Sequence, residues 1–373
     1  MARLHPLQTI LSPILGPLSL AYGSLAYAKR ALTHRGTLKS ASLPRPCVAV
    51  GNISWGGTGK TPVTDFLLTR AAQQGLRAAV LTRGYGAHPP HLPYPVQASS
   101  PPGECGDEPL MLKRSHPEAD VVVDPVRLRG GLSILAGGLP DFYILDDGFQ
   151  HVAVRRDLDL VLLDIEDVLH DAPGRNPSNW NRTIPRGSWR EPERSLRDAG
   201  AFLIKAEPED WPALVPSLKK RLAAFPRPVF AFRMAACGLA PVSDAARSLP
   251  GPEGGYAFVS GIGAPGQAIR TASAFLGREP SARLDLPDHH DYTGEKARLE
   301  HLGLPLVCTA KDAVKLAELR LSAPCWSLSV RAEFHASLSA EQIAGTADKD
   351  TTPSPSFDTW WSEWQQAHIP AHT

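Results

Sequence analysis

Short apolar runs along the chain alternate with segments whose apolar positions recur at helical spacing. Runs with few polar residues predict buried strands at 47–50, 78–82, 121–123, 142–145, 158–164 and 201–205. Apolar residues at Val63, Phe66 and Leu67 fall on one face of a predicted helix that starts at Lys60. Buried strands that alternate with helices indicate a parallel sheet covered on both faces. The fold class that we predict is therefore α/β.

A second set of strands follows position 207, at 228–232, 256–260, 306–309 and 326–330. A chain of 373 residues is long enough for two domains of ordinary size. We predict an N-terminal interfacial helix over 1–35, a core domain over 36–206 and a smaller α/β domain over 207–335. Residues 336–373 are predicted to be a disordered tail.

The tail contains an aromatic stripe at helical spacing, made of Phe357, Trp360, Trp361 and Trp364. Such a stripe is typical of a helix that docks on the protein's own core. The alternative is a second contact with a membrane surface, where tryptophan is favoured. The nearby acidic residues Asp358 and Glu363 argue against that alternative.

The segment from Leu7 to Ala28 carries no charge and ends at Lys29 and Arg30. Prolines, glycines and serines interrupt it, so it fits a membrane-spanning helix poorly. It also fits a secretory signal poorly, since no clean cleavage site follows it. We predict a helix that lies in the headgroup region with Lys29, Arg30 and Arg35 facing anionic lipid. The alternative is a helix that packs on its own core.

The charge and cysteine content of the chain argue against some classes of function. The net charge is +1, from 39 basic and 38 acidic residues, which argues against a nucleic-acid partner. The five cysteines form no CxxC pair. Their scatter indicates a reducing compartment and argues against both a disulfide framework and a zinc site.

A glycine-rich loop joins the strand at 47–50 to the helix that Lys60 and Thr61 begin. In this setting backbone N–H groups surround phosphates, the lysine reaches the outer phosphates and the threonine hydroxyl holds Mg²⁺. Ser54 stands where the usual pattern has its first glycine, so the flexibility is shifted within the loop. The alternative is a turn that binds nothing. The predicted phosphate-binding residues are Ser54, Trp55, Gly56, Gly57, Thr58, Gly59, Lys60 and Thr61.

Two aspartates, Asp146 and Asp147, end the buried strand at 142–145. An aspartate at this place, downstream of a phosphate-binding loop, is typical of the Mg²⁺ side of a nucleotide site. The alternative is an acidic turn. A second polar cluster, 287–293 with sequence PDHHDYT, favours a general-base, orienting or substrate-binding role over a solvated loop.

Taken together, these motifs resemble the tetraacyldisaccharide 4'-kinase family of lipid A synthesis. The resemblance spans 7–330 and rests on nine blocks in the family's order. They are VGNISWGGTGKTP (50–62), TRGYG (82–86), GDEP (106–109), VVDPVR (122–127), LDDGFQH (145–151), RDLDLVLLD (156–164), REP (190–192), PDHHDYT (287–293) and KDAVKL (311–316).

The resemblance implies transfer of the γ-phosphoryl group of ATP, with Mg²⁺, to the 4'-hydroxyl of an acylated disaccharide 1-phosphate. It implies Asp107 and His289 as the catalytic pair. Because these two come from different predicted domains, we expect the reaction in the cleft between them. Further implied residues are Glu191 as a metal ligand, and Arg83, Gln150, His151 and Arg190 as acceptor contacts. The family's N-terminal helix implies a peripheral enzyme on the cytoplasmic face of the inner membrane.

Three departures from the family pattern affect the predicted acceptor contacts more than the nucleotide site. Val152-Ala153 replace a basic pair, the approach to REP is longer, and Ala310 replaces a glutamate. Three alternatives stay open. One is a kinase of another glycolipid or small alcohol, and another is a nucleotide-gated binding module. The third is a membrane-cycling partitioning ATPase, which Trp55 argues against, because that class has a lysine at this position.

Overall fold

The computed structural model describes residues 12–169, 180–263, 265–288, 290–346 and 354–370. The chain forms two compact units, each made of segments that are distant in sequence. Unit 1 combines 84–123 with 234–332, and unit 2 combines the chain up to 83 with 124–233 and the chain from 333 onward. The sequence pattern assigned 84–123 to the core domain over 36–206 and separated it from 207–335. This assignment is wrong. This segment joins the later half of the chain because its helix packs there.

A parallel sheet with the order β8-β7-β6-β1-β5-β2 forms the centre of unit 2. Every residue of β1, β2, β5 and β6 is buried, which explains why these strands hold so few polar residues. The strands are β1 (Cys47–Asn52), β2 (Ala78–Thr82), β5 (Phe142–Asp146), β6 (Leu158–Leu163), β7 (Ala201–Lys205) and the first part of β8 (Val229–Pro241).

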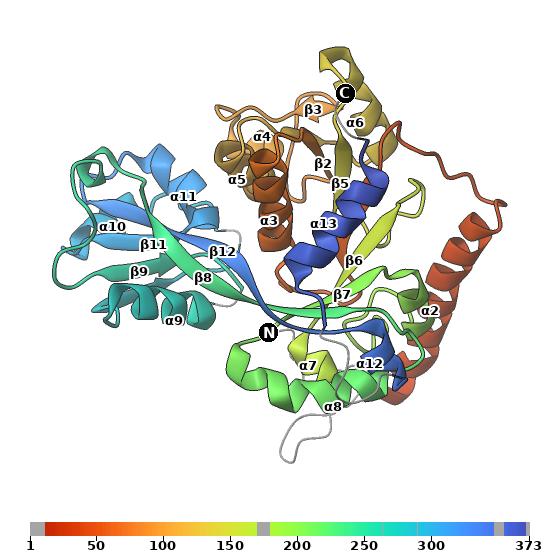
Figure 1. Ribbon diagram of the computed structural model, residues 1–373. Coiled ribbons are helices and arrows are strands. Elements are labelled where there is room, and N and C mark those ends of the chain that lie inside the picture. Colours follow the sequence, from red (N-terminus) through yellow and green to blue (C-terminus); the bar gives the residue numbers. More distant parts are fainter. Residues whose placement is uncertain (1–11, 170–179, 264, 289, 347–353, 371–373) are drawn as a thin grey trace. The chain divides into compact units, whose positions relative to one another are not determined.

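Helices cover both faces of this sheet, as the sequence predicted (Figure 1). On one face, Leu214 and Leu218 of α8 and Ile343 of α12 join the core formed by Val161 and Phe202. The other face carries α3 and α13. The helices of unit 2 are α2 (Ser12–His34), α3 (Lys60–Gln73), α6 (Arg127–Ser133), α7 (Ile165–Val168), α8 (Trp211–Leu222), α12 (Ala340–Ala344) and α13 (Phe357–His368).

The aromatic stripe near the C-terminus is helical and buried, so a disordered tail over 336–373 is the wrong prediction where the structure describes it. The Phe357 ring stacks on Phe334 with 4.0 Å between the ring centroids, and it also contacts Phe230 at 5.1 Å. Trp361, which is 1% exposed, meets Phe142 of β5. The stripe therefore docks on the protein's own core, and the alternative of a second membrane contact is wrong.

Unit 1 is a smaller α/β structure with the strand order β10-β9-β11-β12-β8. In Figure 1, α9 (Pro265–Leu276) lies on one side of these strands, and α10 (Lys296–His301) and α11 (Ala310–Leu316) lie on the other. The strands are β9 (Ala257–Ser260), β10 (Ala282–Asp285), β11 (Leu306–Thr309), the later part of β8 and the first part of β12 (Cys325–Leu338). Both long strands exceed the predicted runs because each continues from one unit into the other.

The segment 84–123 of unit 1 contains an antiparallel pair and two helices. These elements are β3 (Tyr94–Pro95), α4 (Pro102–Cys105), α5 (Asp107–Ser115) and β4 (Asp120–Val123). Gly106 joins the two helices with φ +88°, a conformation that favours glycine, and so allows α5 to begin at Asp107. α5 packs against α11.

Helix α2 buries its polar positions and exposes its apolar ones. Its buried residues, Ser19, Gly23, Arg30 and Thr33, share one face at helical spacing. The large apolar residues Ile14, Leu18, Leu20, Tyr22, Leu25 and Leu32 are exposed, up to 74% for Leu20. Among the described residues, no helix has the length and apolarity that crossing a bilayer requires.

Arg30 corrects one part of the prediction for this helix. Its side chain is 2% exposed and donates to the Glu191 carboxylate at 2.8 Å, to Asp198 at 2.5 Å and to the Phe149 carbonyl at 2.6 Å. The expectation that Arg30 faces lipid is therefore wrong, because buried carboxylates hold it inside unit 2. Lys29 and Arg35 are exposed.

Candidate active site

The predicted phosphate loop connects β1 to the first turn of α3, in the middle of the unit 2 sheet. Gly59 occupies the N-cap position with φ +97°, and no side chain caps the helix. The first N–H groups of α3 therefore keep their capacity to bind an anion. The Ser54 and Thr58 hydroxyls are buried and have no hydrogen-bond partner among the described residues. A polar ligand at this loop would satisfy such groups.

Positive side chains converge on Asp147 at the end of β5. Arg190 donates two hydrogen bonds of 2.8 Å to the Asp147 carboxylate, and the Lys60 Nζ lies 3.6 Å from Asp147 Oδ1. Lys60 also donates to Asn52 Oδ1 at 3.3 Å, and Arg190 donates to the Asn52 carbonyl at 2.9 Å. Asp147 has φ +51°, which directs its side chain into this cluster at the cost of an uncommon backbone conformation.

Electrostatics in this cluster favour negative charge. Burial raises the pKa of Asp147, but the hydrogen bonds from Arg190 and the charge of Lys60 outweigh it and lower that pKa to about 2. The lysine and arginine therefore hold one carboxylate in its ionised form. A second anion, such as a phosphate, would share the same two cations.

The neighbouring carboxylate, Asp146, is 8% exposed and accepts a 3.0 Å hydrogen bond from the Thr82 hydroxyl. β1 and β5 are adjacent, with Val50 paired to Asp146, so Asp146 and the loop share the carboxyl edge of the sheet. Oxygen ligands of this kind suit Mg²⁺, which usually takes one or two carboxylates and completes its shell with water and phosphate oxygens. In the described part of the chain, no three His, Cys, Asp or Glu side chains gather into an all-protein metal site.

The residues predicted to contact the acceptor occupy several different places in unit 2. Arg190 belongs to the Asp147 cluster. Gln150 Nε2 donates to the Asn52 carbonyl at 3.0 Å, so it also adjoins the loop. Arg83 is exposed immediately after β2. His151 is partly buried, and burial together with the charges of Arg127 and Lys29 lowers its pKa to about 4.

The remaining predicted site residues are Glu191, Thr61 and His289. Glu191, predicted as a metal ligand, is buried and accepts a hydrogen bond from Arg30. Thr61 is half-buried in the first turn of α3. His289, predicted as a catalytic residue, lies outside the described residues.

In unit 1, Asp107 is the first residue of α5 and forms an ion pair with Lys315 of α11 at 2.7 Å. The side chains are 9% and 14% exposed, so this pair is well shielded from solvent. Lys315 also donates to the His290 carbonyl at 3.0 Å. We expected Asp107 and the PDHHDYT cluster to belong to different domains. This expectation is wrong, because both belong to unit 1.

The described residues on either side of position 289 are fixed to α11. Asp288 lies 3.3 Å from the Lys311 ammonium, and His290 contacts Lys315 through its carbonyl. Tyr292 is fully buried and donates 2.8 Å to Asp312, which also accepts from the Gly261 N–H and the Thr309 hydroxyl. Burial and the Asp312 carboxylate raise the pKa of Tyr292 strongly, so it remains a hydrogen-bond donor.

Sequence reasoning did not assign roles to Asn52 or Lys315. Asn52 ends β1 directly before the loop, a position from which a side chain reaches bound phosphates. Lys311 and Lys315 are four residues apart on α11, so they share one face. That spacing was available in the sequence, but their acidic partners on α5 are about two hundred residues away in the chain, and only the fold identifies them.

Comparison with known proteins identifies related sequences and a related structure. The family model described as tetraacyldisaccharide-1-P 4'-kinase matches residues 11–346. The tetraacyldisaccharide 4'-kinase of Oleidesulfovibrio alaskensis is 46% identical over 97% of this chain and 98% of its own length. That of Nitratidesulfovibrio vulgaris is 43% identical over 96% and 95%. The crystal structure of LpxK from Aquifex aeolicus in complex with ATP superposes with a TM-score of 0.66 at 27% identity, covering 88% of this chain and 95% of that one.

Proposed function

The chain belongs to the tetraacyldisaccharide-1-P 4'-kinase family, and we propose that it phosphorylates the 4'-hydroxyl of a tetraacylated glucosamine disaccharide 1-phosphate. The phosphoryl donor is ATP, and the product is the bisphosphorylated precursor of lipid A. One observation carries the proposal at the level of the site. The uncapped first turn of α3 and the Lys60 ammonium lie beside the ionised Asp147 carboxylate, and the same loop carries two unsatisfied hydroxyls.

Residues of unit 2 bind the nucleotide in this proposal. The backbone from Ser54 to Gly59 surrounds the phosphates, and Lys60 and Arg190 balance their charge. Thr61, Asp146 and Asp147 supply hard oxygen ligands that fit Mg²⁺, which neutralises charge on phosphate oxygens when bound. Glu191 is the weakest of the predicted ligands, since its carboxylate already has a buried cation as partner.

Unit 1 supplies the base. A sugar hydroxyl is a weak nucleophile, so a carboxylate that accepts its proton assists the reaction. In the proposed step, the 4'-oxygen forms a bond to the γ-phosphorus while its proton passes to Asp107. The bond from the γ-phosphorus to the bridging oxygen breaks, and its electron pair leaves with ADP. His289 assists the carboxylate.

Lys315 is a positioning residue for this base. Its ammonium fixes the Asp107 carboxylate at 2.7 Å and simultaneously binds the carbonyl of His290. One lysine therefore ties α5 to the segment beside position 289. Misplacement of a catalytic group by about 1 Å costs roughly 100-fold in rate. Loss of the contact from Lys315 should therefore lower the rate substantially.

The exposed apolar face of α2 is proposed to enter the bilayer surface. A soluble helix normally buries its apolar side, whereas α2 buries Ser19, Gly23 and Arg30 and presents leucines outward. Exposed patches of this kind mark contact with lipid or protein. The acceptor is itself a lipid, so we place the enzyme peripherally on the cytoplasmic face of the inner membrane, with no nucleic-acid partner.

The decisive experiment incubates the purified full-length protein with γ-labelled ATP, Mg²⁺ and the tetraacylated disaccharide 1-phosphate in a neutral detergent. The expected result is label in the lipid, on the 4'-position of the distal sugar. Release of labelled phosphate without labelled lipid would contradict the proposal and favour an ATPase.

Membrane docking has its own test. Leu20→Glu and Leu25→Glu should each shift the protein from sedimenting with anionic vesicles toward the supernatant, because each places a charge on the apolar face. Leu249→Glu, at an exposed leucine in unit 1, is the matched control. Equal sedimentation of all three variants and the wild type would rule out α2 as the docking element.

A further inference from the structure

A large basic cavity in unit 2 has no role in the nucleotide site. Its volume is about 1500 Å³. Most of its lining comes from the end of α2 with the loop that follows, the loop between β5 and β6, and 125–128, and Asp159 and Asp198 complete it. Typical ligand pockets hold about 300–1,000 Å³, so this cavity has room for a sugar phosphate. His151 belongs to its lining and follows Asp147 by only four residues. One lining segment of the cavity therefore continues along the chain from Asp147.

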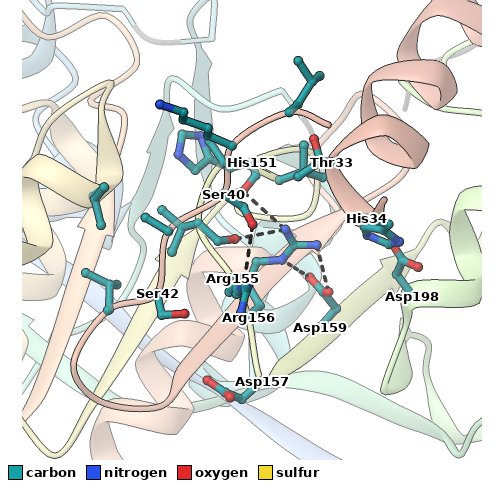
Figure 2. A pocket seen from close by; sticks show the side chains of 18 of the residues that line it. Thr33, His34, Ser40, Ser42, His151, Arg155, Arg156, Asp157, Asp159 and Asp198 are labelled. Carbon is teal, nitrogen blue, oxygen red and sulfur yellow. Dashed lines mark hydrogen bonds and ion pairs between the residues drawn. The ribbon is translucent and has the colours of Figure 1, made fainter. Parts of the chain in front are cut away.

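The charges of the cavity do not cancel. Arg156 pairs with Asp159, and Asp198 pairs with Arg30 and His34, which accounts for two of the three acidic side chains in the lining. The third, Asp157, accepts a hydrogen bond from the Cys47 N–H. Figure 2 shows Asp157 at the edge of the group formed by Ser40, Arg155 and Arg156.

Three further cations in the lining, Lys39, Arg45 and Arg155, have no carboxylate partner among the described residues. Arg155 makes one long contact, 3.5 Å from its Nε to the Ser40 hydroxyl. The Arg45 Nε is buried and has no hydrogen-bond partner among the residues that the structure describes. A buried, unsatisfied guanidinium nitrogen is costly unless an acceptor reaches it. Three cations and one carboxylate leave a positive balance that suits an anion.

Two other features of the lining favour a phosphate. Serine hydroxyls at 40 and 42 offer hydrogen bonds beside the cations. The last turn of α2 ends at the cavity. Its carbonyl oxygens are already hydrogen-bonded, so they do not repel an anion there. N–H groups of the following loop bond to the carbonyls of Ala31, Leu32 and Thr33.

The field at His151, which also lines the cavity, is positive. Burial lowers the pKa of His151, and the charges of Arg127, Lys29 and Arg156 lower it further. His151 is therefore neutral at pH 7, so it can hydrogen-bond to a sugar hydroxyl without adding charge. Lys39 and Arg45 lie on the segment after α2, and Arg155 lies in the same loop as His151.

We infer that this cavity binds the 1-phosphate end of the acceptor, with Lys39, Arg45 and Arg155 as its phosphate contacts. This inference depends on the proposed acceptor and names where unit 2 recognises its anionic group. It also accounts for one departure from the family pattern. Val152-Ala153 replace the usual basic pair after the LDDGFQH block, and Arg155 supplies a cation slightly later in the same loop.

The test compares two acceptors, the tetraacylated disaccharide with its 1-phosphate and the same lipid with that phosphate removed. Arg155→Gln and Lys39→Gln should each raise KM for the phosphorylated acceptor about 10-fold or more, since each removes a charge-assisted contact. Their KM for the dephosphorylated acceptor and for ATP should stay within twofold of the wild type. Lys219→Gln, an exposed lysine on α8, is the matched control and should change neither value.

Two outcomes would overturn the inference. One is an equal change for both acceptors, or no change for either. The other is reduced sedimentation of Arg155→Gln with vesicles of anionic phospholipid in the absence of acceptor, together with unchanged acceptor discrimination in detergent. That result would assign the cations to bilayer lipid. Failure of the wild type to phosphorylate either lipid would instead contradict the proposed function, so the two failures are distinguishable.

Discussion

The two units build their polar sites in different ways. In unit 2, the phosphate cluster forms at the carboxyl ends of two adjacent parallel strands, β1 and β5, and the loop and helix that follow β1 complete it. In unit 1, Asp107 and Lys315 come from helices separated by about two hundred residues. Strand and loop patterns in the sequence locate most of the first site, although Arg190 reaches it from a distant segment, while only tertiary packing brings together the pair of the second site. Mutations should therefore separate nucleotide binding from phosphoryl transfer.

Lys60→Met should produce the largest loss. Without the ammonium, the phosphates lose their main cation and Asp147 loses one of its two partners. We expect turnover to fall about 10³-fold or more, with weaker ATP binding. Titration calorimetry with a non-hydrolysable ATP analogue measures the binding. The matched control is Lys219→Gln, and wild-type ATP affinity in Lys60→Met would remove the loop from the nucleotide site.

Lys315→Met should have the next largest effect, and it tests unit 1 alone. We expect kcat to fall about 10- to 100-fold with an unchanged KM for ATP, because the base loses its fixed position. Lys315→Arg keeps the charge and should restore most of kcat. If Lys315→Arg is as inactive as Lys315→Met while both melt like the wild type, the charge at this position is not what matters.

Trp361→Ala tests how far the C-terminal helix belongs to unit 2. The side chain is 1% exposed and packs on Phe142 of the central sheet. Its removal should lower the free energy of unfolding by about 3–5 kcal/mol, measured from urea melts. Glu363→Ala, exposed on the same helix, should change it by less than about 0.5 kcal/mol. Similar losses for the two variants would contradict the packing described above.

The smallest expected effect concerns pH. The pKa of His151 is lowered to about 4 by burial and nearby cations, so the folded state binds this proton less well than the unfolded state. Stability therefore falls as pH drops from about 6.5 to 4, and it is fully present above that window. His151→Gln should reduce the loss between pH 7 and pH 5 by an amount of order 1 kcal/mol.

A matched substitution makes this pH prediction specific. His301→Gln, at an exposed histidine of α10 in unit 1, should leave the slope of stability against pH unchanged. Thermal melts of the three proteins at each pH provide the comparison. An identical slope in His151→Gln and the wild type would show that His151 does not titrate as described.

The sequence predicted the parallel sheet and the strand, glycine-rich loop and helix around Lys60 well, for a physical reason. Buried parallel strands need apolar residues throughout, and a phosphate loop needs its glycines and Lys60 at fixed spacing, so both leave local patterns. The aromatic stripe at 357–364 predicted a helix that docks on the core, but the polar composition before it led to a predicted disordered tail over 336–373. The stripe's partners, Phe230 and Phe334, are distant in sequence and only the fold identifies them.

Other features of the site left no local pattern. The charge on Arg30 suggested contact with lipid, but its buried partners Glu191 and Asp198 lie more than 160 residues away. The grouping of 84–123 with the later half of the chain depends on the packing of α5 against α11. Pairings of this kind depend on the order of strands and helices in space, which spacing along the chain does not encode.

The most direct test of the division between the units is Asp107→Asn, studied by ATP binding and by single-turnover transfer to the lipid acceptor. The account predicts wild-type affinity for Mg-ATP, because unit 2 is intact. It also predicts a rate of transfer lowered about 10²- to 10⁴-fold, because the proton acceptor is gone. Transfer at the wild-type rate, or loss of ATP binding together with transfer, would contradict it.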